Sequence, residues 1–145
     1  MKKAQEYLES KGIHASQQRI AILDYLLKNP IHPTAEEIYE HLSSGMPTLS
    51  KTTIYNTLKL FAEKGAVSVV LIDEKTAHYD ATMERHAHFL CRECGKIYDI
   101  AMSEEEMREE EKPLSALKGF EIEECQTYYK GICKKCKISG KSTTY

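Results

Sequence analysis

Residues 34–65 read TAEEIYEHLSSGMPTLSKTTIYNTLKLFAEKG and predict two helices joined by a short turn. Thr34 stands three residues before Glu37, which is the capping-box pattern of a helix start. Ser50 can cap the second helix, and Gly65 follows it in the position of a C′ glycine. Because the Ser-Gly-Met-Pro run between the helices favours a turn, the segment has the pattern of a helix-turn-helix whose second helix reads a DNA groove.

The second predicted helix separates an apolar face from a polar one. Ile54, Leu58 and Phe61 recur at helical spacing and are expected to face inward. Polar or amphipathic side chains fill the first turns and could meet phosphates and base edges. These candidate DNA contacts are Ser50, Lys51, Thr52, Thr53, Tyr55 and Asn56, with Arg19 on the preceding helix as a further candidate. Since polar first turns are common, the pattern by itself leaves an ordinary solvated helix as the alternative.

The segments on either side of this pair complete a winged-helix pattern. An amphipathic turn runs from Tyr7 to Gly12, and Ser16 can cap a helix over QQRIAILDYLLKN. The expected apolar stripe of that helix consists of Ile20, Ile22, Leu23, Leu26 and Leu27. After the helix pair, AVSVVLI and AHYD, separated by DEKT, predict a β-hairpin. We therefore predict a winged helix-turn-helix domain at residues 1–80.

Residues 81–145 predict a second, smaller domain. Short β-rich segments, HFLC, KIYDI, FEIEE and QTYYKGIC, surround the acidic run EEEMREEE at 104–111, which is expected to be a solvated helix. The predicted fold class is thus α+β, with an N-terminal winged helix-turn-helix domain and a small C-terminal α/β domain.

Composition restricts the possible partners. The 145 residues are 41% hydrophobic and 29% charged, and the net charge of −2 means that any nucleic-acid binding must use a local patch. No run approaches the roughly 20 apolar residues of a membrane span. The N-terminal MKKAQEYLESKG lacks the apolar core of a signal peptide. We therefore expect a cytoplasmic protein that does not associate with membranes.

Four of the five cysteines form two Cys-x-x-C pairs, Cys91 with Cys94 and Cys133 with Cys136. One tight turn of this spacing directs two thiolates at one ion, and four thiolates make the closed tetrahedral shell of structural Zn²⁺. In a reducing compartment such pairs favour a metal over a disulfide. A redox-active dithiol and two unrelated buried pairs remain the alternatives, and Cys125 is expected to be a thiol outside the zinc site.

The stretch RHAHFLCRECGKIYD at 85–99 adds a second group of candidate ligands. His86 and His88 have the period of a strand, so their rings share one face, whereas Cys91 is an odd number of residues from both. If the Cys-x-x-C turn at Cys91–Cys94, the first zinc knuckle, is also a hairpin turn, the returning strand places Asp99 opposite His88. Imidazole and carboxylate ligands suit Fe(II), Mn(II) or Zn(II), so we expect a site separate from the thiolates. Exposed strand residues are the simpler alternative.

Together these motifs resemble the ferric uptake regulator (Fur) family of bacterial metal-dependent repressors, and most closely its peroxide-responsive repressor (PerR) branch. The resemblance rests on SQQRIAIL, HPTAEEIY, TTIYNTLKLFAEKG, HxHFLCRECGKIYD and GICKKC in this order. It implies a homodimer in which the C-terminal domain dimerises and the N-terminal domain binds a double-stranded DNA operator. It also implies structural zinc on the four paired cysteines.

The resemblance further implies a regulatory Fe²⁺ or Mn²⁺ site that joins the two domains. Its ligands by position are His32, Asp80, His86, His88 and Asp99. Both carboxylates are Asp, as in the peroxide sensors, whereas the iron sensors tend to carry Glu. In the peroxide branch bound Fe(II) oxidises its own ligand histidines, and the oxidation-sensitive positions here are His32 and His86. An iron, zinc or manganese uptake regulator without peroxide chemistry is the alternative.

An enzymatic function is disfavoured, because five protein ligands leave little room for a substrate and no His-Glu-x-x-His motif is present. A zinc-ribbon adaptor would leave TTIYNTLKLF without a role. The chain also departs from the family pattern at three places. His14 stands where a basic residue is common, Pro113 interrupts the dimerisation-domain helix, and Cys125 lies near the position of a later histidine, so a further metal site of the iron sensors is expected to be absent.

Overall fold

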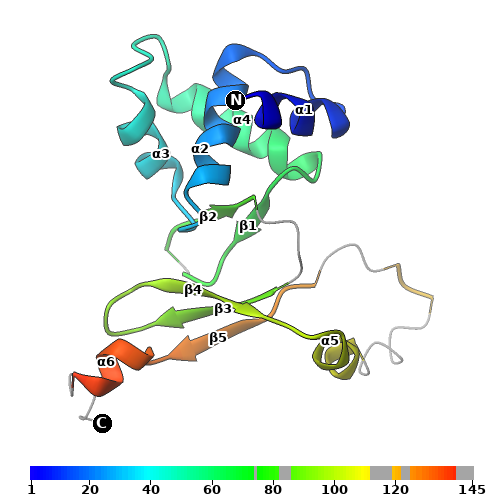
Figure 1. The fold of residues 1–145 in the computed structure, drawn as a ribbon, viewed down its shortest axis with the longest axis vertical. Coiled ribbons are helices and arrows are strands. Elements are labelled where there is room, and N and C mark those ends of the chain that lie inside the picture. The colour runs from blue at the N-terminus through cyan, green and yellow to red at the C-terminus, as the bar shows by residue number, and fades with distance from the viewer. Residues whose placement is uncertain (74, 82–85, 112–118, 122–124, 140–145) are drawn as a thin grey trace. The chain divides into compact units, whose positions relative to one another are not determined.

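The computed structural model describes residues 1–145 except 74, 82–85, 112–118, 122–124 and 140–145. The chain forms two compact units, Met1–Met83 and Glu84–Tyr145. Each unit has its own helices and its own sheet (Figure 1). Within the described residues, no helix is both long enough and apolar enough to span a bilayer.

The N-terminal unit has the predicted winged-helix order of four helices followed by a hairpin. These elements are α1 (Lys2–Ser10), α2 (Gln17–Lys28), α3 (Ala35–Leu42), α4 (Lys51–Glu63), β1 (Ser68–Val70) and β2 (His78–Asp80). The strands β1 and β2 pair in antiparallel register, with Val69 opposite Tyr79. The predicted hairpin is therefore present, with shorter strands and a longer connecting loop than the sequence pattern indicated.

Local capping contacts explain where the helices begin. The Thr34 hydroxyl accepts from the Glu37 backbone N–H at 3.2 Å, and the Glu37 carboxylate accepts from the Thr34 N–H at 3.3 Å, which confirms the capping box. The Ser50 hydroxyl accepts from the Thr53 N–H at 3.0 Å and caps α4. Gly65 has φ +74°, a conformation that glycine adopts without strain, and it follows α4 as predicted.

The first helix differs from its prediction. A turn from Tyr7 to Gly12 was expected, but α1 begins at Lys2 and ends at Ser10. Ala4 and Leu8, four residues apart on one helix face, are both fully buried. The start of the helix therefore depends on the packing of this face rather than on a strong side-chain cap, and Met1 provides no side-chain cap hydrogen bond.

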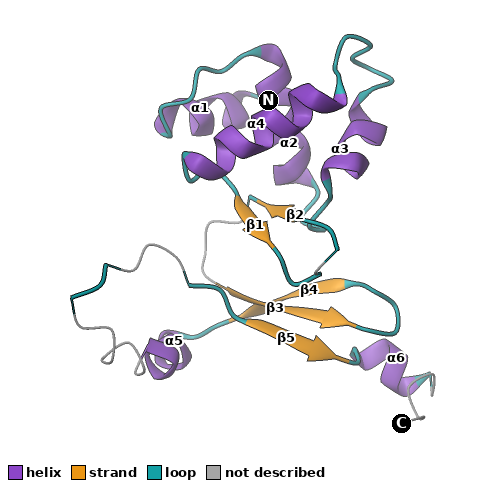
Figure 2. Cartoon of the chain, turned by 180° about the vertical axis from the view of Figure 1, so that it is seen from behind, coloured by secondary structure: helices purple, strands orange, loops and turns teal. Residues whose placement is uncertain are grey.

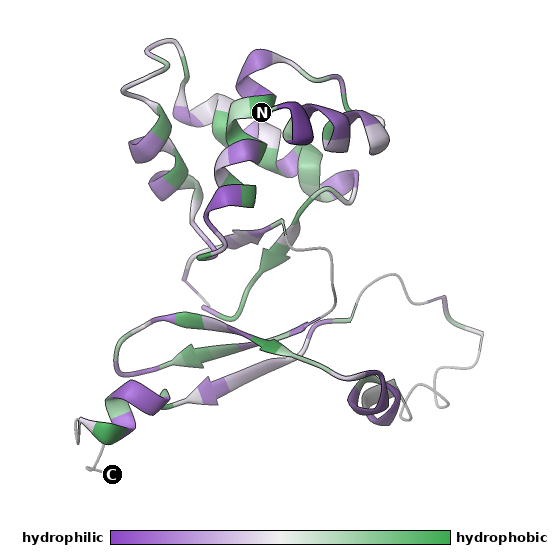
Figure 3. Ribbon diagram, viewed as in Figure 1, coloured by the Kyte–Doolittle hydropathy of each residue, from purple (hydrophilic) through white to green (hydrophobic). Residues whose placement is uncertain are grey.

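The core of the N-terminal unit joins apolar residues from all four helices. Ile54, Leu58 and Phe61 are fully buried, which confirms the inward face of α4. On α2 the buried residues are Ala21, Ile22, Leu23 and Leu26. Ile20 and Leu27 belong to the predicted stripe but are only partly buried, because they lie at its edges and pack against the cluster from outside. Figure 3 shows the resulting alternation of hydrophobic and hydrophilic residues on these helices.

The C-terminal unit contains a sheet with the strand order β4-β3-β5 among its described residues (Figure 2). Its elements are β3 (His86–Cys91), β4 (Ile97–Ala101), α5 (Glu104–Glu111), β5 (Tyr128–Gly131) and α6 (Lys134–Ile138). β3 is antiparallel to β4 and parallel to β5. The central strand is therefore the one that carries both histidines and the first cysteine.

Two further predictions for this unit have different outcomes. The acidic run forms α5, which is coloured mostly hydrophilic in Figure 3, as expected for a solvated helix. A strand at FEIEE is not observed at Phe120 and Glu121, which have no regular structure, and residues 122–124 lie outside the described part of the chain. Pro113, whose effect on the helix was in question, also lies outside the described residues.

Candidate metal centres and nucleic-acid interface

The four paired cysteines come together within the C-terminal unit. Cys91 ends β3 and Cys94 follows in the adjoining turn, while Cys133 directly precedes α6 and Cys136 lies within that helix. Parallel pairing of β3 with β5 sets Cys91 opposite Gly131, so that the second knuckle begins beside the first. The four sulfur atoms all lie within 4.8 Å of one another.

Hydrogen bonds distribute charge unequally within this cysteine cluster. The Cys91 sulfur accepts from the backbone N–H groups of Cys94 at 3.5 Å and of Cys133 at 3.3 Å. These donors, the Cys94 N–H first among them, lower the pKa of Cys91. The Tyr98 hydroxyl donates to the Cys133 thiolate and, with the backbone N–H of Cys136, lowers the pKa of Cys133 to about 6.

The pKa of the Cys136 thiol is shifted in the opposite direction. Cys136 donates its S–H to the Cys133 thiolate, and this contact, together with burial, raises the pKa of Cys136 to about 12. Adjacent thiolates repel one another, and a bound dication would neutralise their charge. Four converging sulfurs, three of them on buried residues, suit tetrahedral Zn²⁺. Cys125 is exposed and does not belong to this group.

The histidine pair lies on the same strand as Cys91 but forms a different group. In the register of β3 with β4, His88 is directly opposite Asp99, which confirms the pairing predicted from the hairpin. Asp99 Oδ1 lies 3.1 Å from His86 Nε2 and 3.5 Å from His88 Nε2, and the two Nε2 atoms are 3.0 Å apart. Two imidazole nitrogens and a carboxylate oxygen therefore converge within hydrogen-bonding distance, as ligands of one cation do.

Two further predicted ligands form a pair in the N-terminal unit. His32 lies between α2 and α3 and Asp80 ends β2, and their side chains are almost fully buried. His32 Nε2 is 3.6 Å from Asp80 Oδ2. A buried carboxylate requires a partner of opposite charge or a hydrogen bond, and an adjacent imidazole offers one. This His/Asp chemistry, like that of His86, His88 and Asp99, suits Fe(II) or Mn(II).

Glu36, which the sequence pattern did not identify, makes hydrogen bonds to side chains on the polar face of α4. The Glu36 carboxylate of α3 accepts from the Lys51 ammonium at 3.3 Å and from the Tyr55 hydroxyl at 3.2 Å. Ser50, Lys51 and Tyr55 are exposed, with Tyr55 at 47%. No local signal indicates this role for Glu36, because it depends on the crossing of two helices.

Three of the remaining candidate DNA contacts line a surface groove between α2 and α4, whereas Thr52 is exposed on α4 and does not line it. Arg19, Thr53 and Asn56 line it, and the Arg19 guanidinium donates to the His14 carbonyl oxygen at 3.0 Å. The other lining residues are His14, Ser16, Gln18 and Thr57. Hydroxyl, amide and guanidinium groups in this arrangement offer donors to a phosphate and both donors and acceptors to a base edge.

Comparison with known proteins agrees with these features. The sequence model of the ferric uptake regulator family matches residues 10–130. A peroxide-responsive repressor, PerR, of Staphylococcus aureus strain Mu50 is 35% identical over 130 residues, covering 90% of this chain and 86% of that protein.

Solved structures support the fold. The ferric uptake regulator of Helicobacter pylori aligns with a TM-score of 0.71 over 94% of this chain and 90% of its own, at 23% identity. PerR from Streptococcus pyogenes aligns with a TM-score of 0.50 over 92% of this chain and 90% of its own, at 30% identity. The match over residues 10–130 spans both units, and the chain accordingly belongs to the ferric uptake regulator family of metal-responsive transcriptional regulators.

Proposed function

We propose that this regulator is a DNA-binding repressor that senses peroxide through oxidation of its own histidine ligands. The observation that carries the proposal is the convergence of His86 and His88 on Asp99, at 3.1 and 3.5 Å from one carboxylate oxygen. The identity of 35% with a peroxide-responsive repressor supports the same conclusion. Asp80 and Asp99 supply the Asp carboxylates that this branch of the family uses.

The proposed ligands fall into two groups with different tasks. Cys91, Cys94, Cys133 and Cys136 hold structural Zn²⁺ and stabilise the C-terminal unit, because binding free energy at such a site is folding free energy. The regulatory ion, Fe²⁺ or Mn²⁺, takes its ligands from both units. This second set consists of His32, Asp80, His86, His88 and Asp99.

Sharing one ion between two units provides a switch. An ion that needs ligands from the N-terminal and the C-terminal unit favours the arrangement in which both sets reach it. In a homodimer that arrangement fixes the spacing of two α4 helices and hence their fit to two operator half-sites. Ser50, Lys51, Thr53, Tyr55, Asn56 and Arg19 would then contact the double-stranded operator. Such a DNA-bound repressor would act in the cytoplasm.

Oxidation of a ligand histidine ends this arrangement. A bound Fe(II) would catalyse this oxidation, in which the two electrons that reduce peroxide to water come from the imidazole ring. At His32 or His86 an imidazole C–H becomes a C=O, so the residue gains one oxygen atom from peroxide and the other leaves as water. Both ring nitrogens of the product carry hydrogen and no longer offer a lone pair to a metal. The modified histidine therefore leaves the ligand set, and the preference for the DNA-binding arrangement is lost.

Mass spectrometry of the iron-loaded protein before and after dilute peroxide tests the proposal. We expect one added oxygen on a peptide containing His32 or His86, and none in the manganese-loaded control. If iron-loaded protein stays unmodified while it still binds DNA in a metal-dependent manner, the chain is instead an iron, zinc or manganese uptake regulator without peroxide chemistry.

A further inference from the structure

The backbone at His32 has an unusual conformation. His32 has a φ of +58°, and no other non-glycine residue in the described part of the chain has a positive φ. Pro33 follows it, and a residue before proline normally adopts an extended conformation. A left-handed conformation at such a position persists only where surrounding contacts hold it. Those contacts therefore determine the direction in which the His32 imidazole leaves the main chain.

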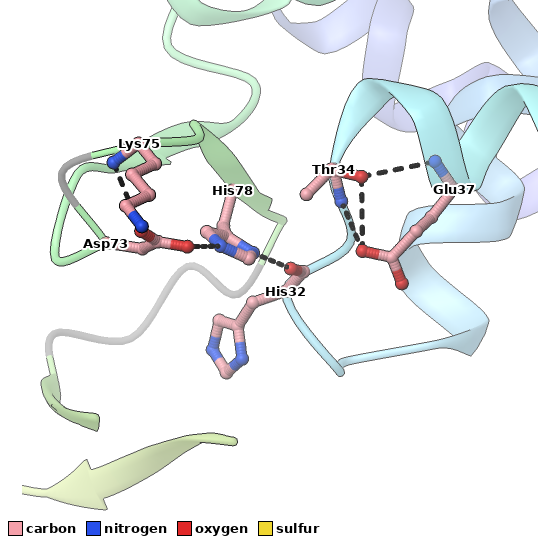
Figure 4. Close-up of polar contacts among 6 residues, drawn as sticks. All are labelled: His32, Thr34, Glu37, Asp73, Lys75 and His78. Atoms are coloured by element: carbon pink, nitrogen blue, oxygen red, sulfur yellow. Dashed lines mark hydrogen bonds and ion pairs between the residues drawn. The ribbon is translucent and has the colours of Figure 1, made fainter. Parts of the chain in front are cut away.

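The strand β2 supplies two of these contacts. His78 Nδ1 lies 2.7 Å from the His32 carbonyl oxygen (Figure 4). Because a carbonyl oxygen only accepts, Nδ1 carries the proton and donates it. The next residue of the strand, Tyr79, donates its backbone N–H to the Pro33 carbonyl oxygen at 3.0 Å. The strand β2 thus holds two successive carbonyl groups, those of His32 and Pro33.

The His78 ring is itself oriented from the loop between β1 and β2. Its Nε2 is 3.5 Å from Asp73 Oδ2, while Asp73 Oδ1 accepts from the Lys75 backbone N–H at 3.1 Å (Figure 4). The His78 side chain is 15% exposed, so neighbouring atoms also restrict its rotation. The chain after Pro33 is fixed independently by the capping box of α3.

We propose that His78 is a positioning residue for the regulatory metal, acting through the His32 main chain to direct the His32 imidazole. The inference rests on the proposed role of His32 as a ligand. The His78 ring contacts the backbone carbonyl of His32, a proposed ligand, and His78 is not itself assigned to the ligand set. Partners that orient a ligand in this way typically change metal affinity by about 10–100-fold when they are removed. The same contact links the wing loop, which carries Asp73, to the proposed metal site.

The test compares Mn²⁺ affinity in full-length, zinc-loaded variants by isothermal titration calorimetry. His78→Phe keeps a ring in place but cannot donate, and we expect it to weaken Mn²⁺ binding on the order of tenfold. His78→Asn retains an N–H donor near the Nδ1 position and should recover most of the affinity. Lys75→Ala is the matched control, because it removes an exposed side chain of the same loop and keeps the backbone N–H that donates to Asp73.

A second measurement is made without regulatory metal. The backbone chemical shifts of His32 report its φ and ψ, and they should move toward extended values in His78→Phe but not in His78→Asn or Lys75→Ala. A side chain that served only general stability would leave these shifts unchanged. Unchanged His32 shifts, or unchanged Mn²⁺ affinity in His78→Phe, would overturn the inference.

A double-mutant comparison separates this inference from the proposed function. If His32→Ala leaves Mn²⁺ affinity at the wild-type value, His32 is not a ligand and the proposed site is wrong. If His32→Ala weakens binding, the effect of His78→Phe should disappear in the His32→Ala background, since the ligand it positions is gone. A full additional loss in that background would mean that His78 does not act through His32.

Discussion

Two neighbouring residues of α4 allow a sharp test of which helix face reads DNA. Ile54 is fully buried in the N-terminal core, whereas Tyr55 is 47% exposed. Ile54→Ala removes three buried carbon atoms, which amounts to roughly 2.4 kcal/mol at about 0.8 kcal/mol each. The cavity left behind adds to this loss, so the free energy of unfolding should fall by about 2–5 kcal/mol.

Tyr55→Ala should have the opposite profile. Its hydroxyl donates to Glu36 at 3.2 Å in an exposed setting, so the substitution should lower the free energy of unfolding by less than about 1 kcal/mol. If the ring contacts a base or a phosphate, its removal should weaken operator binding by about 1–3 kcal/mol. The exposed carboxylate of Glu36 would remain and would add like charge near the DNA.

Both quantities are measured on protein that carries structural zinc and is saturated with Mn²⁺, at one protein concentration. Urea unfolding followed by helical circular dichroism gives the stability, and fluorescence anisotropy with a duplex selected by the wild-type protein, at fixed salt, gives DNA affinity. The reasoning is refuted if Tyr55→Ala destabilises as much as Ile54→Ala. It is equally refuted if Tyr55→Ala leaves operator affinity unchanged, because α4 would then present another face to DNA.

Further predictions concern the two proposed metal sites. Cys136→Ser should release structural zinc and abolish the dimer, whereas Cys125→Ser should keep both. Metal analysis and analytical ultracentrifugation measure the zinc content and the dimer. A zinc-loaded Cys136→Ser dimer would contradict the four-thiolate assignment. The pKa of Cys136 is raised to about 12, so this thiol must lose its proton when it binds zinc. Zinc binding should therefore release protons, and the affinity for zinc should fall as pH falls. A zinc affinity that does not depend on pH in chelator competition would show that this reasoning is wrong. The Asp99→Glu protein should still bind iron and operator, but peroxide should no longer release it rapidly from DNA, because the longer side chain shifts the carboxylate. In the wild type, peroxide should release the iron-loaded form and not the manganese-loaded form. Equal release of both forms would point to oxidation of a thiol such as Cys125 rather than of a ligand histidine.

Short-range patterns determined much of this protein. The starts of α3 and α4 follow from Thr34 and Ser50, whose side chains bond to backbone groups only three residues away. The two-residue period of a strand put His86 and His88 on one face, and the hairpin turn at the knuckle brought Asp99 opposite His88. Such contacts can be predicted because each depends on residues close in the chain.

Tertiary structure decided the features that depend on distant segments. The two cysteine knuckles meet because β5 pairs with β3 in parallel, which brings the sulfurs of Cys94 and Cys133 within 3.9 Å although these residues are 39 positions apart. Glu36 holds Tyr55 only because α3 and α4 cross. These arrangements follow from the burial of apolar faces, which has no direct local signature.

His32 illustrates the limit most clearly. The sequence identified it as a candidate ligand, but its position before Pro33 favours an extended backbone. The structure instead places it at φ +58°, with its carbonyl oxygen bonded to His78, 46 positions along the chain. A local preference of this kind is worth only a few kcal/mol, about 1–3 for a strained residue, and long-range hydrogen bonds and burial can exceed it.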